Sequence, residues 1–498
     1  MNSLPAAWLV HPDDSVALAL EPLAEGRLLE VAGDSVVVRQ PVPRGHKLAL
    51  RAMPAGAVVH KYGHPIGKLT AAVEAGEHIH THNLTTMLQG GLDAHWTGSE
   101  RTAPVPVASS RSFLGYRRAD GRVGTRQEIW IIATVGCVRR TVERIAEIAG
   151  RNHAGRIGAV RPIVHPFGCS QVGGDLDATR RLLAALASHP NAGGVLVVGL
   201  GCESNQAAAL MAGIEGRDDG SLRFLGTQQA SDEIAEGLAL VDELVARLEG
   251  ERPVPCALSE LVVGLKCGGS DGFSGITANP LVGRIADAVT AVGGKAVLTE
   301  IPECFGAESL LLKRTVSNPV FDRLLSVFSD FRRYFIDQGE PLHENPSPGN
   351  LEGGITTLEE KSLGAVQKGG QALVTDAIRY GERTKVPGLC VLEAPGNDAV
   401  SSTALAAAGA TVILFTTGRG TPLGFPVPTI KVASNSALAQ RKPHWIDFDA
   451  GQVLAHGDWG RAVEDLLDCT LRIASGEKTC AEKAGESEIA VWKRGVTL

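Results

Sequence analysis

From residue 113 onward, apolar runs of strand length alternate along the chain with amphipathic helical stretches. The runs contain few polar residues, and stretches such as 138–150 and 232–250 repeat apolar residues at helical spacing. Near-continuous apolar strands are typical of a parallel sheet with helices on both faces, because both faces of each strand are then buried. The sequence therefore predicts an α/β fold with mostly parallel, Rossmann-like sheets. The apolar runs cover residues 128–136, 195–201, 260–269, 295–300, 389–396 and 411–420.

Changes in hydrophobic pattern and composition divide the chain into domains. Residues 1–84 consist of short, alternating apolar and polar segments bounded by Gly, Pro and Asp, which is typical of a small β-rich domain. Residues 85–112 show no clear period and contain many Gly, Pro, Ser and Thr residues, as an interdomain linker does. The segment around Pro253 then separates two α/β units, 113–252 and 253–498, and we expect the second to be the catalytic unit.

The composition excludes several classes of function. A net charge of −7 provides no broad attraction for nucleic acid or anionic lipid. No apolar run approaches the roughly 18 residues needed to cross a bilayer, and the first residues lack the basic and apolar regions of a secretion signal. Neither a Walker A motif nor a G-x-G-x-x-G fingerprint after a first strand is present. We therefore expect a cytoplasmic protein that binds no nucleic acid, membrane or nucleotide.

The nine cysteines are widely spaced and include no C-x-x-C pair, which argues against a disulfide framework or a zinc ribbon. A buried cysteine is usually a small core hydrophobe. Four of them, however, follow apolar runs, a position that also suits a metal ligand: Cys137, Cys169, Cys202 and Cys267. Their spacings match no standard iron–sulfur run, so we expect single metal ligands and no iron–sulfur cluster.

Polar residues gather where the predicted strands end. Ligands of open α/β sheets bind beyond the carboxyl ends of the strands, so these loops predict one polar rim. Two of them, 268–275 and 416–422, combine several glycines with Ser, Asp and Arg. Such loops serve as simple turns, but their backbone N–H groups also bind carboxylate or phosphate, and Arg419 would add a bidentate clamp.

A second group of candidates lies near the end of the β-rich domain. His78, His80 and His82 alternate with other residues, so on a strand their rings would share one face. Aligned imidazoles suit a divalent transition metal or a proton relay. The alternative is a solvated edge without chemistry.

At this point the motifs indicate a family. The segments RGHKLAL, KYGHPIG and GEHIHTHN, followed by LVVGLKCGGSDGFSGITANP, NPSPGN and FTTGRGTP, resemble the altronate/galactarate dehydratase family over nearly the whole chain. The resemblance is strongest to the altronate branch and implies an N-terminal SAF-like domain. It also implies a hydro-lyase that converts D-altronate into 2-keto-3-deoxy-D-gluconate with divalent iron, or alternatively manganese, as cofactor.

The expected chemistry assigns roles to particular residues. A divalent metal chelated by the carboxylate and 2-hydroxyl of a sugar acid stabilises the charge that develops when a base removes the α-proton, and an acid helps the 3-hydroxyl to leave. The candidate metal ligands are Cys169, Cys202, Glu203, Cys267 and Asp271. The candidate substrate-binding residues are Ser270, Thr277, Asn279, Thr416, Thr417 and Arg419. The candidates for proton transfer are His165, Lys266, His80 and His82.

Alternatives remain open at this stage. Residues 166–170 and Asn397 depart from the family pattern, so the sugar acid is not fixed. A galactarate dehydratase, or a sulfolactate sulfo-lyase that expels a different group, would use the same enolate chemistry. A non-catalytic sugar-acid sensor would need the binding rim but not the metal ligands. The sequence does not distinguish a monomer from a homo-oligomer.

Overall fold

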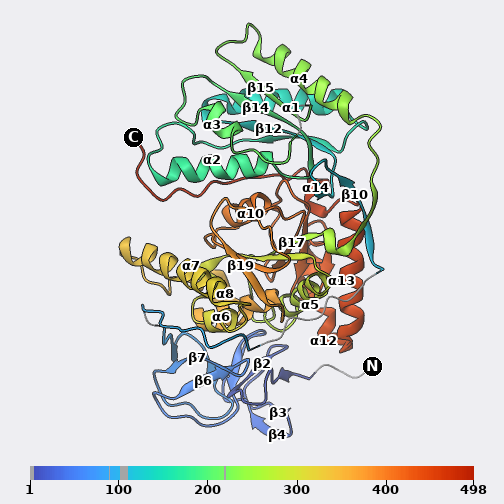
Figure 1. Ribbon diagram of the computed structural model, residues 1–498. Helices are drawn as coiled ribbons and strands as arrows, with labels where there is room; N and C mark the ends of the chain where they lie inside the picture. The colour runs from blue at the N-terminus through green and yellow to red at the C-terminus, as the bar shows by residue number, and fades with distance from the viewer. Residues whose placement is uncertain (1–4, 89, 101–109, 218–219) are drawn as a thin grey trace.

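The computed structural model describes residues 5–88, 90–100, 110–217 and 220–498. Its three units are stacked one above another. The N-terminal unit lies at the bottom of Figure 1, the C-terminal unit in the middle and the unit formed by residues 113–252 at the top. The predicted fold class is confirmed: a β-rich domain precedes two parallel α/β sheets. Part of the predicted linker, 101–109 and residue 89, lies outside the described residues, and the proposed domain boundaries stay predictions.

The N-terminal unit consists of short antiparallel strands. Its four-stranded sheet has the order β1-β2-β5-β8, beside a β3-β4 hairpin and a three-stranded β6-β7-β9 sheet. The core of this unit has two parts: β3 and β4 pack with residues of β1, β2 and β5 in a small cluster, while β6, β7 and β9 join the core of the C-terminal unit. The strands are β1 (Ala7–Trp8), β2 (Val16–Ala19), β3 (Leu28–Val31), β4 (Asp34–Val37), β5 (Lys47–Ala49), β6 (Val58–Lys61), β7 (His64–Leu69), β8 (His78–Ile79) and β9 (Leu84–Thr85).

The middle unit is a parallel sheet of order β13-β12-β14-β15 with helices on both faces. Along β12, Ile129 and Ile131 face α1 and α4, while Trp130 and Ile132 face α2 and a core shared with the C-terminal unit. The elements are β12 (Glu128–Ala133), α1 (Arg139–Asn152), β13 (Ala159–Ile163), α2 (Gly174–Ala187), β14 (Ala192–Gly199), α3 (Ala207–Met211), β15 (Leu222–Gly226) and α4 (Glu233–Leu248). An antiparallel sheet, β11 (Val123–Gly124), β10 (Ser112–Arg117) and β16 (Val254–Ala257), joins this unit to the next.

The C-terminal unit is a seven-stranded parallel sheet of order β19-β20-β18-β17-β21-β22-β23. Its strands are β17 (Val262–Cys267), β18 (Lys295–Leu298), β19 (Val374–Ile378), β20 (Gly388–Leu392), β21 (Val412–Thr417), β22 (Thr429–Ala433) and β23 (Phe448–Asp449). Its helices are α5 (Ala278–Ala291), α6 (Glu308–Leu312), α7 (Asn318–Asp337), α8 (Pro348–Glu352), α9 (Leu358–Ala365), α10 (Asp398–Ala407), α11 (Ser436–Arg441), α12 (Gln452–His456), α13 (Trp459–Ala474) and α14 (Cys480–Ala484). Among the described helices we find none long and apolar enough to span a membrane.

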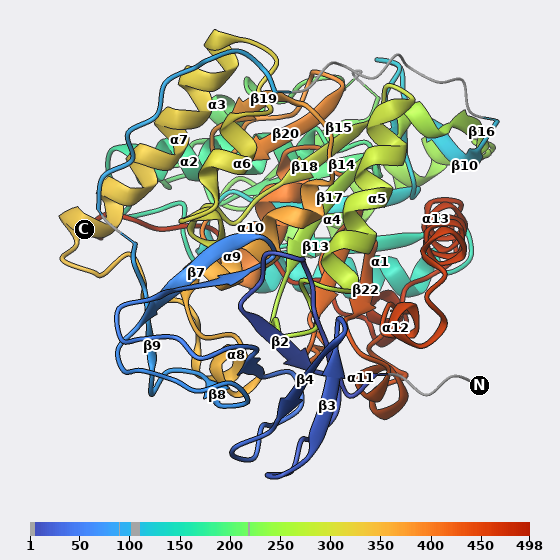
Figure 2. The ribbon, with the colours of Figure 1, turned by 90° about the horizontal axis from the view of Figure 1, so that it is seen from below.

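The strand order identifies where ligands should bind. In the C-terminal unit the chain proceeds from β17 to β18, β19 and β20 on one side and then crosses to β21 on the other, so β17 and β21 flank the switch point. In the middle unit, β12 is flanked by β13 and β14 in the same way. Ligands of such sheets bind at the carboxyl ends of the strands that flank the switch. Seen from below, the N-terminal unit lies over the C-terminal unit beside α8 and α9 (Figure 2), and α9 packs against β7.

Candidate active site

The loops after β17 and β21 meet at the switch point of the C-terminal sheet. Cys267, the last residue of β17, is opposite Thr416 in register. Beyond them, the backbone N–H groups of Gly418 and Arg419 both donate to the carbonyl of Gly269 at 3.1 Å. The two glycine-rich loops predicted to form one rim therefore lie together.

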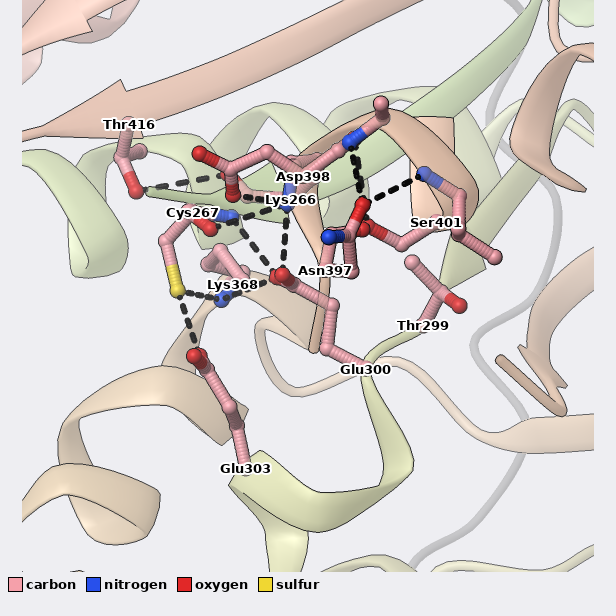
Figure 3. A network of polar contacts seen from close by, with 12 residues as sticks. Lys266, Cys267, Thr299, Glu300, Glu303, Lys368, Asn397, Asp398, Ser401 and Thr416 are labelled. Atoms are coloured by element: carbon pink, nitrogen blue, oxygen red, sulfur yellow. Dashed lines mark hydrogen bonds and ion pairs between the residues drawn. The ribbon is translucent and has the colours of Figure 1, made fainter. Parts of the chain in front are cut away.

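A buried network of charges lies beneath these loops (Figure 3). The ammonium of Lys266 lies 2.6 Å from the Glu300 carboxylate and 2.8 Å from that of Asp398. The thiol of Cys267 donates to Glu303 at 2.9 Å and accepts from Lys368 at 2.6 Å. The side chains of Lys266, Glu300 and Lys368 are at most 1% exposed, so these charges compensate one another with almost no help from water.

The network fixes the protonation states of its members. Burial alone would favour neutral Lys266, but the carboxylates of Glu300 and Asp398 outweigh it and raise its pKa above the usual value. Burial would likewise raise the pKa of Glu303, but Lys361 and Lys368 outweigh it and lower that pKa to about 2. Burial, together with the Glu303 charge, raises the pKa of Cys267 to about 12. Lys266 is therefore a charged, fully paired cation, and Cys267 is a neutral thiol.

Lys361 connects this network to the predicted rim. Its ammonium lies 2.9 Å from Glu303 and donates to the side-chain oxygens of Asn345 and Asn350. Asn350 in turn donates to the carbonyl of Ser270 at 2.8 Å. The segment NPSPGN is thus bonded to the loop after β17.

The N-terminal unit contributes histidines that contact the segment after NPSPGN. A ring nitrogen of His46 lies 3.0 Å from one of His78, and the other nitrogen of His46 is 3.1 Å from the carbonyl of Glu352. His80 is 3.1 Å from the hydroxyl of Thr356. The ring centroid of His82 lies 5.4 Å from that of His78. Four imidazoles therefore gather where the first unit meets residues 352–356 of the C-terminal unit.

Only the first of the three alternating histidines, His78, lies on a strand. β8 ends at Ile79, and residues 80–83 form a turn. The side chain of Asn83 closes it, because it accepts from the backbone N–H of His80 and donates to the carbonyl of His78. The rings still cluster, since a tight turn returns the chain over the end of the strand.

Lys47, Lys61 and Glu360 form a buried ion triad next to the histidines. Lys47 and Lys61 each lie 2.8 Å from the Glu360 carboxylate, and all three side chains are at most 2% exposed. Lys47 also donates to the hydroxyl of Thr356, which contacts His80. Two cations share one carboxylate, so the triad leaves one positive charge unbalanced close to the site, which favours an anionic substrate.

Among the described residues, two groups of side chains offer three metal-ligand atoms within 4.8 Å of one another, and they differ in how well they fit a divalent cation. In the first group, burial and mutual repulsion lower the pKa of His78 to about 3 and that of His80 to about 4, and burial lowers that of His46. Neutral imidazoles are the ligating form and suit iron or manganese. In the second, Lys266, Lys361 and Lys368 already pair with the Glu300 and Glu303 carboxylates, and Cys267 is a neutral thiol. The residues present therefore fit a metal ion at the histidines and not at Cys267.

Several residues predicted to bind substrate or metal instead hydrogen-bond to neighbouring protein groups and hold the loops of the rim in place. The Asp271 carboxylate accepts from the Ser274, Ser434 and Asn435 side chains, so its oxygens are occupied. Thr416 donates to Asn279 at 2.6 Å. The remaining predicted residues have these partners: Thr277 donates to the carbonyls of Phe273 and Ser434, Asn279 to that of Gly364, and Thr417 accepts from the N–H of Gly420. Arg419 differs, because its side chain is 43% exposed and pairs only with Glu352, at 2.6 Å, among the contacts of the described residues.

Four predicted residues lie in the middle unit instead. Both ring nitrogens of buried His165 are engaged by backbone groups, the carbonyl of Ala133 and the N–H of Phe167, and burial lowers its pKa to about 4. Glu203 is buried and accepts from Thr134 and from two backbone N–H groups. Cys169 and Cys202 are exposed. The structure does not bring these four residues together with Cys267.

The sequence reading gave no role to several members of the site. These members are His46, Glu300, Glu303, Lys361 and Lys368. One signal was available. In α9, Glu359, Glu360 and Lys361 lie within a stretch of small and apolar residues, and every residue of this helix is buried. Charged residues are almost never fully buried unless paired, so such a helix indicates an internal ion network.

Comparison with known proteins identifies the family. Family models match residues 5–87 as the altronate/galactarate dehydratase SAF domain, 115–249 as the D-galactarate dehydratase/altronate hydrolase second domain and 258–497 as the D-galactarate/altronate dehydratase C-terminal domain. The chain is 48% identical over 491 residues to the altronate dehydratase of Escherichia coli, which covers 98% of this chain and 99% of that relative. The chain belongs to the altronate/galactarate dehydratase family.

Further relatives agree with this assignment. This family member is 44% identical to the altronate dehydratase of Bacillus subtilis over 98% of the chain and 99% of that relative. It is 33% identical to the L-threo-forming galactarate dehydratase of Escherichia coli, over 94% of the chain and 92% of that relative. The resemblance predicted from the motifs is confirmed, and with it the classification as a dehydratase-type lyase acting on sugar acids.

Proposed function

We propose that this chain dehydrates D-altronate to 2-keto-3-deoxy-D-gluconate with the help of a divalent metal, iron first and manganese second. The observation that carries the proposal is the contact of the histidine cluster with Glu352 and Thr356, next to the loops at the β17–β21 switch point. His46, His78 and His80 would hold the ion. When bound, the ion would polarise the substrate carboxylate as a Lewis acid and so make the α-proton more acidic.

The remaining roles belong to side chains of the chain itself. Arg419 would bind the substrate carboxylate in place of its pairing with Glu352, because a guanidinium forms two parallel hydrogen bonds to a carboxylate. Lys266 and His165 are poor bases, since the first is a paired cation and the second has both ring nitrogens engaged. His82 is exposed and lies beside His78, so we assign it the removal of the proton at C2.

The proton and the hydroxyl leave as one water molecule. His82 takes the C2 proton, and the C3–O bond breaks as the 3-hydroxyl accepts a proton and departs as water. The enol that remains becomes the 2-keto acid by losing the proton of its 2-hydroxyl while C3 takes one up. The nine cysteines are all unpaired, which supports placing the protein in a reducing compartment such as the cytoplasm.

An anaerobic assay tests the proposal. Metal-free protein would be loaded with ferrous iron or manganese and offered D-altronate, galactarate and sulfolactate in parallel. We expect metal-dependent formation of a 2-keto-3-deoxy acid from D-altronate, and loss of both bound metal and turnover in His78→Asn but not in the matched His64→Asn variant. Turnover of galactarate alone would change the substrate, and sulfite release would change the leaving group. Full activity of His78→Asn would contradict the metal assignment.

A further inference from the structure

A second constellation lies at the carboxyl edge of the middle sheet, away from the histidines. Three adjacent strands, β13, β12 and β14, run into loops that each carry a cysteine: Cys169, Cys137 and Cys202. β12 and β14 flank the switch point of this sheet, so the three thiols occupy the edge where an α/β sheet binds its ligands.

Backbone contacts close to each cysteine hold the three loops together. The N–H of Gly136 donates to the carbonyl of Phe167 at 2.8 Å, and the N–H of Asn205 donates to the carbonyl of Gly168 at 2.8 Å. The hydroxyl of Thr134 donates to the Glu203 carboxylate at 2.6 Å, which joins the first loop to the third. Each loop is thus bonded to the other two within three residues of its cysteine.

Gly168 shows how closely the loops approach. Its φ is +96°, and a Cβ at this position would lie 2.1 Å from the carbonyl oxygen of Thr134. Only glycine satisfies both conditions, because it tolerates positive φ and has no side chain. The C-terminal residues brace the same loop, since the N–H of Leu498 donates to the carbonyl of Ser170 at 2.9 Å.

The three thiols are exposed, whereas five of the other six cysteines are buried and the sixth, Cys480, is half-buried. A cysteine used for packing is usually buried, so these three do not serve as core residues. The one hydrogen bond to their sulfur atoms that we find in the described structure is from the amide of Gln228 to Cys202, at 3.5 Å. Exposed thiols at a ligand-binding edge are available as thiolate ligands.

The separation of the thiols favours a cluster over a single ion. Among the described residues, the groups of three ligand atoms within 4.8 Å of one another are the two already described, and these cysteines are not among them. A single zinc or iron ion would draw three sulfurs closer than that, because metal–sulfur bonds are about 2.3 Å long. An iron–sulfur cluster distributes its thiolate ligands over several iron atoms and so accepts wider spacing.

We propose that Cys137, Cys169 and Cys202 bind an iron–sulfur cluster through three thiolates, with one iron left without a protein ligand. The expectation that no cluster is present depended on linear spacing, which is informative only when the ligands follow one another in a single loop. Here they come from three strand ends, which the parallel topology brings together. This site is separate from the proposed histidine site and does not depend on the proposed substrate.

Anaerobic reconstitution with ferrous iron and sulfide tests the inference. The full chain should bind iron and acid-labile sulfide together, with broad visible absorption and an electron paramagnetic resonance signal in one oxidation state. Each of Cys137→Ser, Cys169→Ser and Cys202→Ser should lower labile sulfide at least several-fold. Cys480→Ser, which removes a thiol outside the edge, should keep it, and so should His78→Asn.

Two results would overturn the proposal: iron bound by the wild-type chain without labile sulfide, or labile sulfide unchanged in all three serine variants. Circular dichroism and thermal unfolding of each variant establish that it is folded, and the exposed positions of the three cysteines make folding of the variants the expected result. Because His78→Asn keeps the cluster but loses the proposed histidine-bound metal, failure of this inference is distinguishable from failure of the proposed function.

Discussion

The two parallel sheets of this molecule present their carboxyl edges in opposite ways. At the edge of the C-terminal sheet, Lys266, Glu300 and Lys368 are buried and paired, and the N-terminal unit covers the loops. At the edge of the middle sheet the loops are bonded mainly through their backbone, and Cys137 and Cys202 are exposed. The same topological rule therefore produces a closed, charged edge in one unit and an open edge with thiols in the other.

The difference shows what a covering domain changes. Charges buried beneath a second unit must be compensated by one another, so the closed edge depends on matched pairs and loses stability sharply when one partner is removed. Side chains on an open edge are solvated, and its order depends on backbone geometry instead. Substitutions of carboxylates should therefore affect the closed edge most, and substitutions of glycine the open one.

The largest effect is expected where the N-terminal unit closes the C-terminal edge. Glu360→Gln removes the carboxylate shared by Lys47 and Lys61 and leaves two buried ammonium groups without a counter-ion. We expect a loss of about 3–5 kcal/mol in the free energy of unfolding, measured by denaturant titration. The matched control is Glu143→Gln, because Glu143 also pairs with two cations, Arg139 and Arg140, but on the surface, where the loss should stay below about 1 kcal/mol.

The pH dependence of stability sharpens the same prediction. Burial would raise the pKa of Glu360, but Lys47 and Lys61 outweigh it and lower it from 4.5 to about 2. A carboxyl with a depressed folded-state pKa contributes stability that is fully present above its unfolded pKa and is lost as the pH falls. The wild-type chain should therefore lose stability between pH 4.5 and 2, and Glu360→Gln should show a shallower slope there. Equal slopes would contradict the pairing.

The second prediction concerns the open edge. Gly168→Ala places a Cβ against the carbonyl of Thr134 at positive φ, so we expect a loss of about 3 kcal/mol, measured by thermal unfolding. Gly457→Ala is the control: its φ is also positive, at +67°, in the left-handed helical region, but a Cβ there meets nothing within 4 Å, so it should lose about 1–2 kcal/mol from strain alone. Equal losses would mean that the close approach of the loops contributes nothing.

Sequence patterns were informative about the fold for a physical reason. The apolar runs that became β12, β14, β17 and β21 are buried on both faces, and only a parallel sheet buries both faces of nearly every strand. Positions at strand ends were informative for the same reason, since Cys267 is the last residue of β17 and Thr416 lies next to the end of β21. Both signals are local in the sequence.

Contacts between units were not predictable in this way. The pairing of Lys47 with Glu360 joins positions 313 residues apart, and nothing local to either residue specifies it. His165 is the converse case: its place after a strand predicts a role in catalysis, while in the structure backbone groups contact both ring nitrogens. Asp271 likewise has the right residue type and position, yet it serves as an acceptor that ties loops together. Residue type and strand position indicate a rim, but only the partners distinguish support from chemistry.

The third prediction tests which rim residue meets the substrate. Arg419 is the exposed cation of the closed edge, so Arg419→Gln should lower kcat/KM about 10- to 100-fold, mainly through KM, as loss of a charged hydrogen bond worth about 1.5–3 kcal/mol does. Glu352→Gln removes only its partner and should change KM little or lower it. Steady-state kinetics with the proposed substrate check both. An unchanged KM in Arg419→Gln would exclude the carboxylate role.

The smallest effect is expected at Asn397, one of the departures from the family pattern. Its side chain accepts from the N–H groups of Ala399 and Val400, both at 3.1 Å, and so caps α10. Asn397→Ala should cost about 1 kcal/mol in thermal unfolding, and Asn397→Ser, which retains a capping oxygen, much less. The next residue, Asp398, pairs with Lys266, so a frayed α10 would also loosen the buried network and lower kcat slightly. If KM changed with stability intact, Asn397 would be a substrate contact rather than a cap, and the departure would bear on which sugar acid is bound.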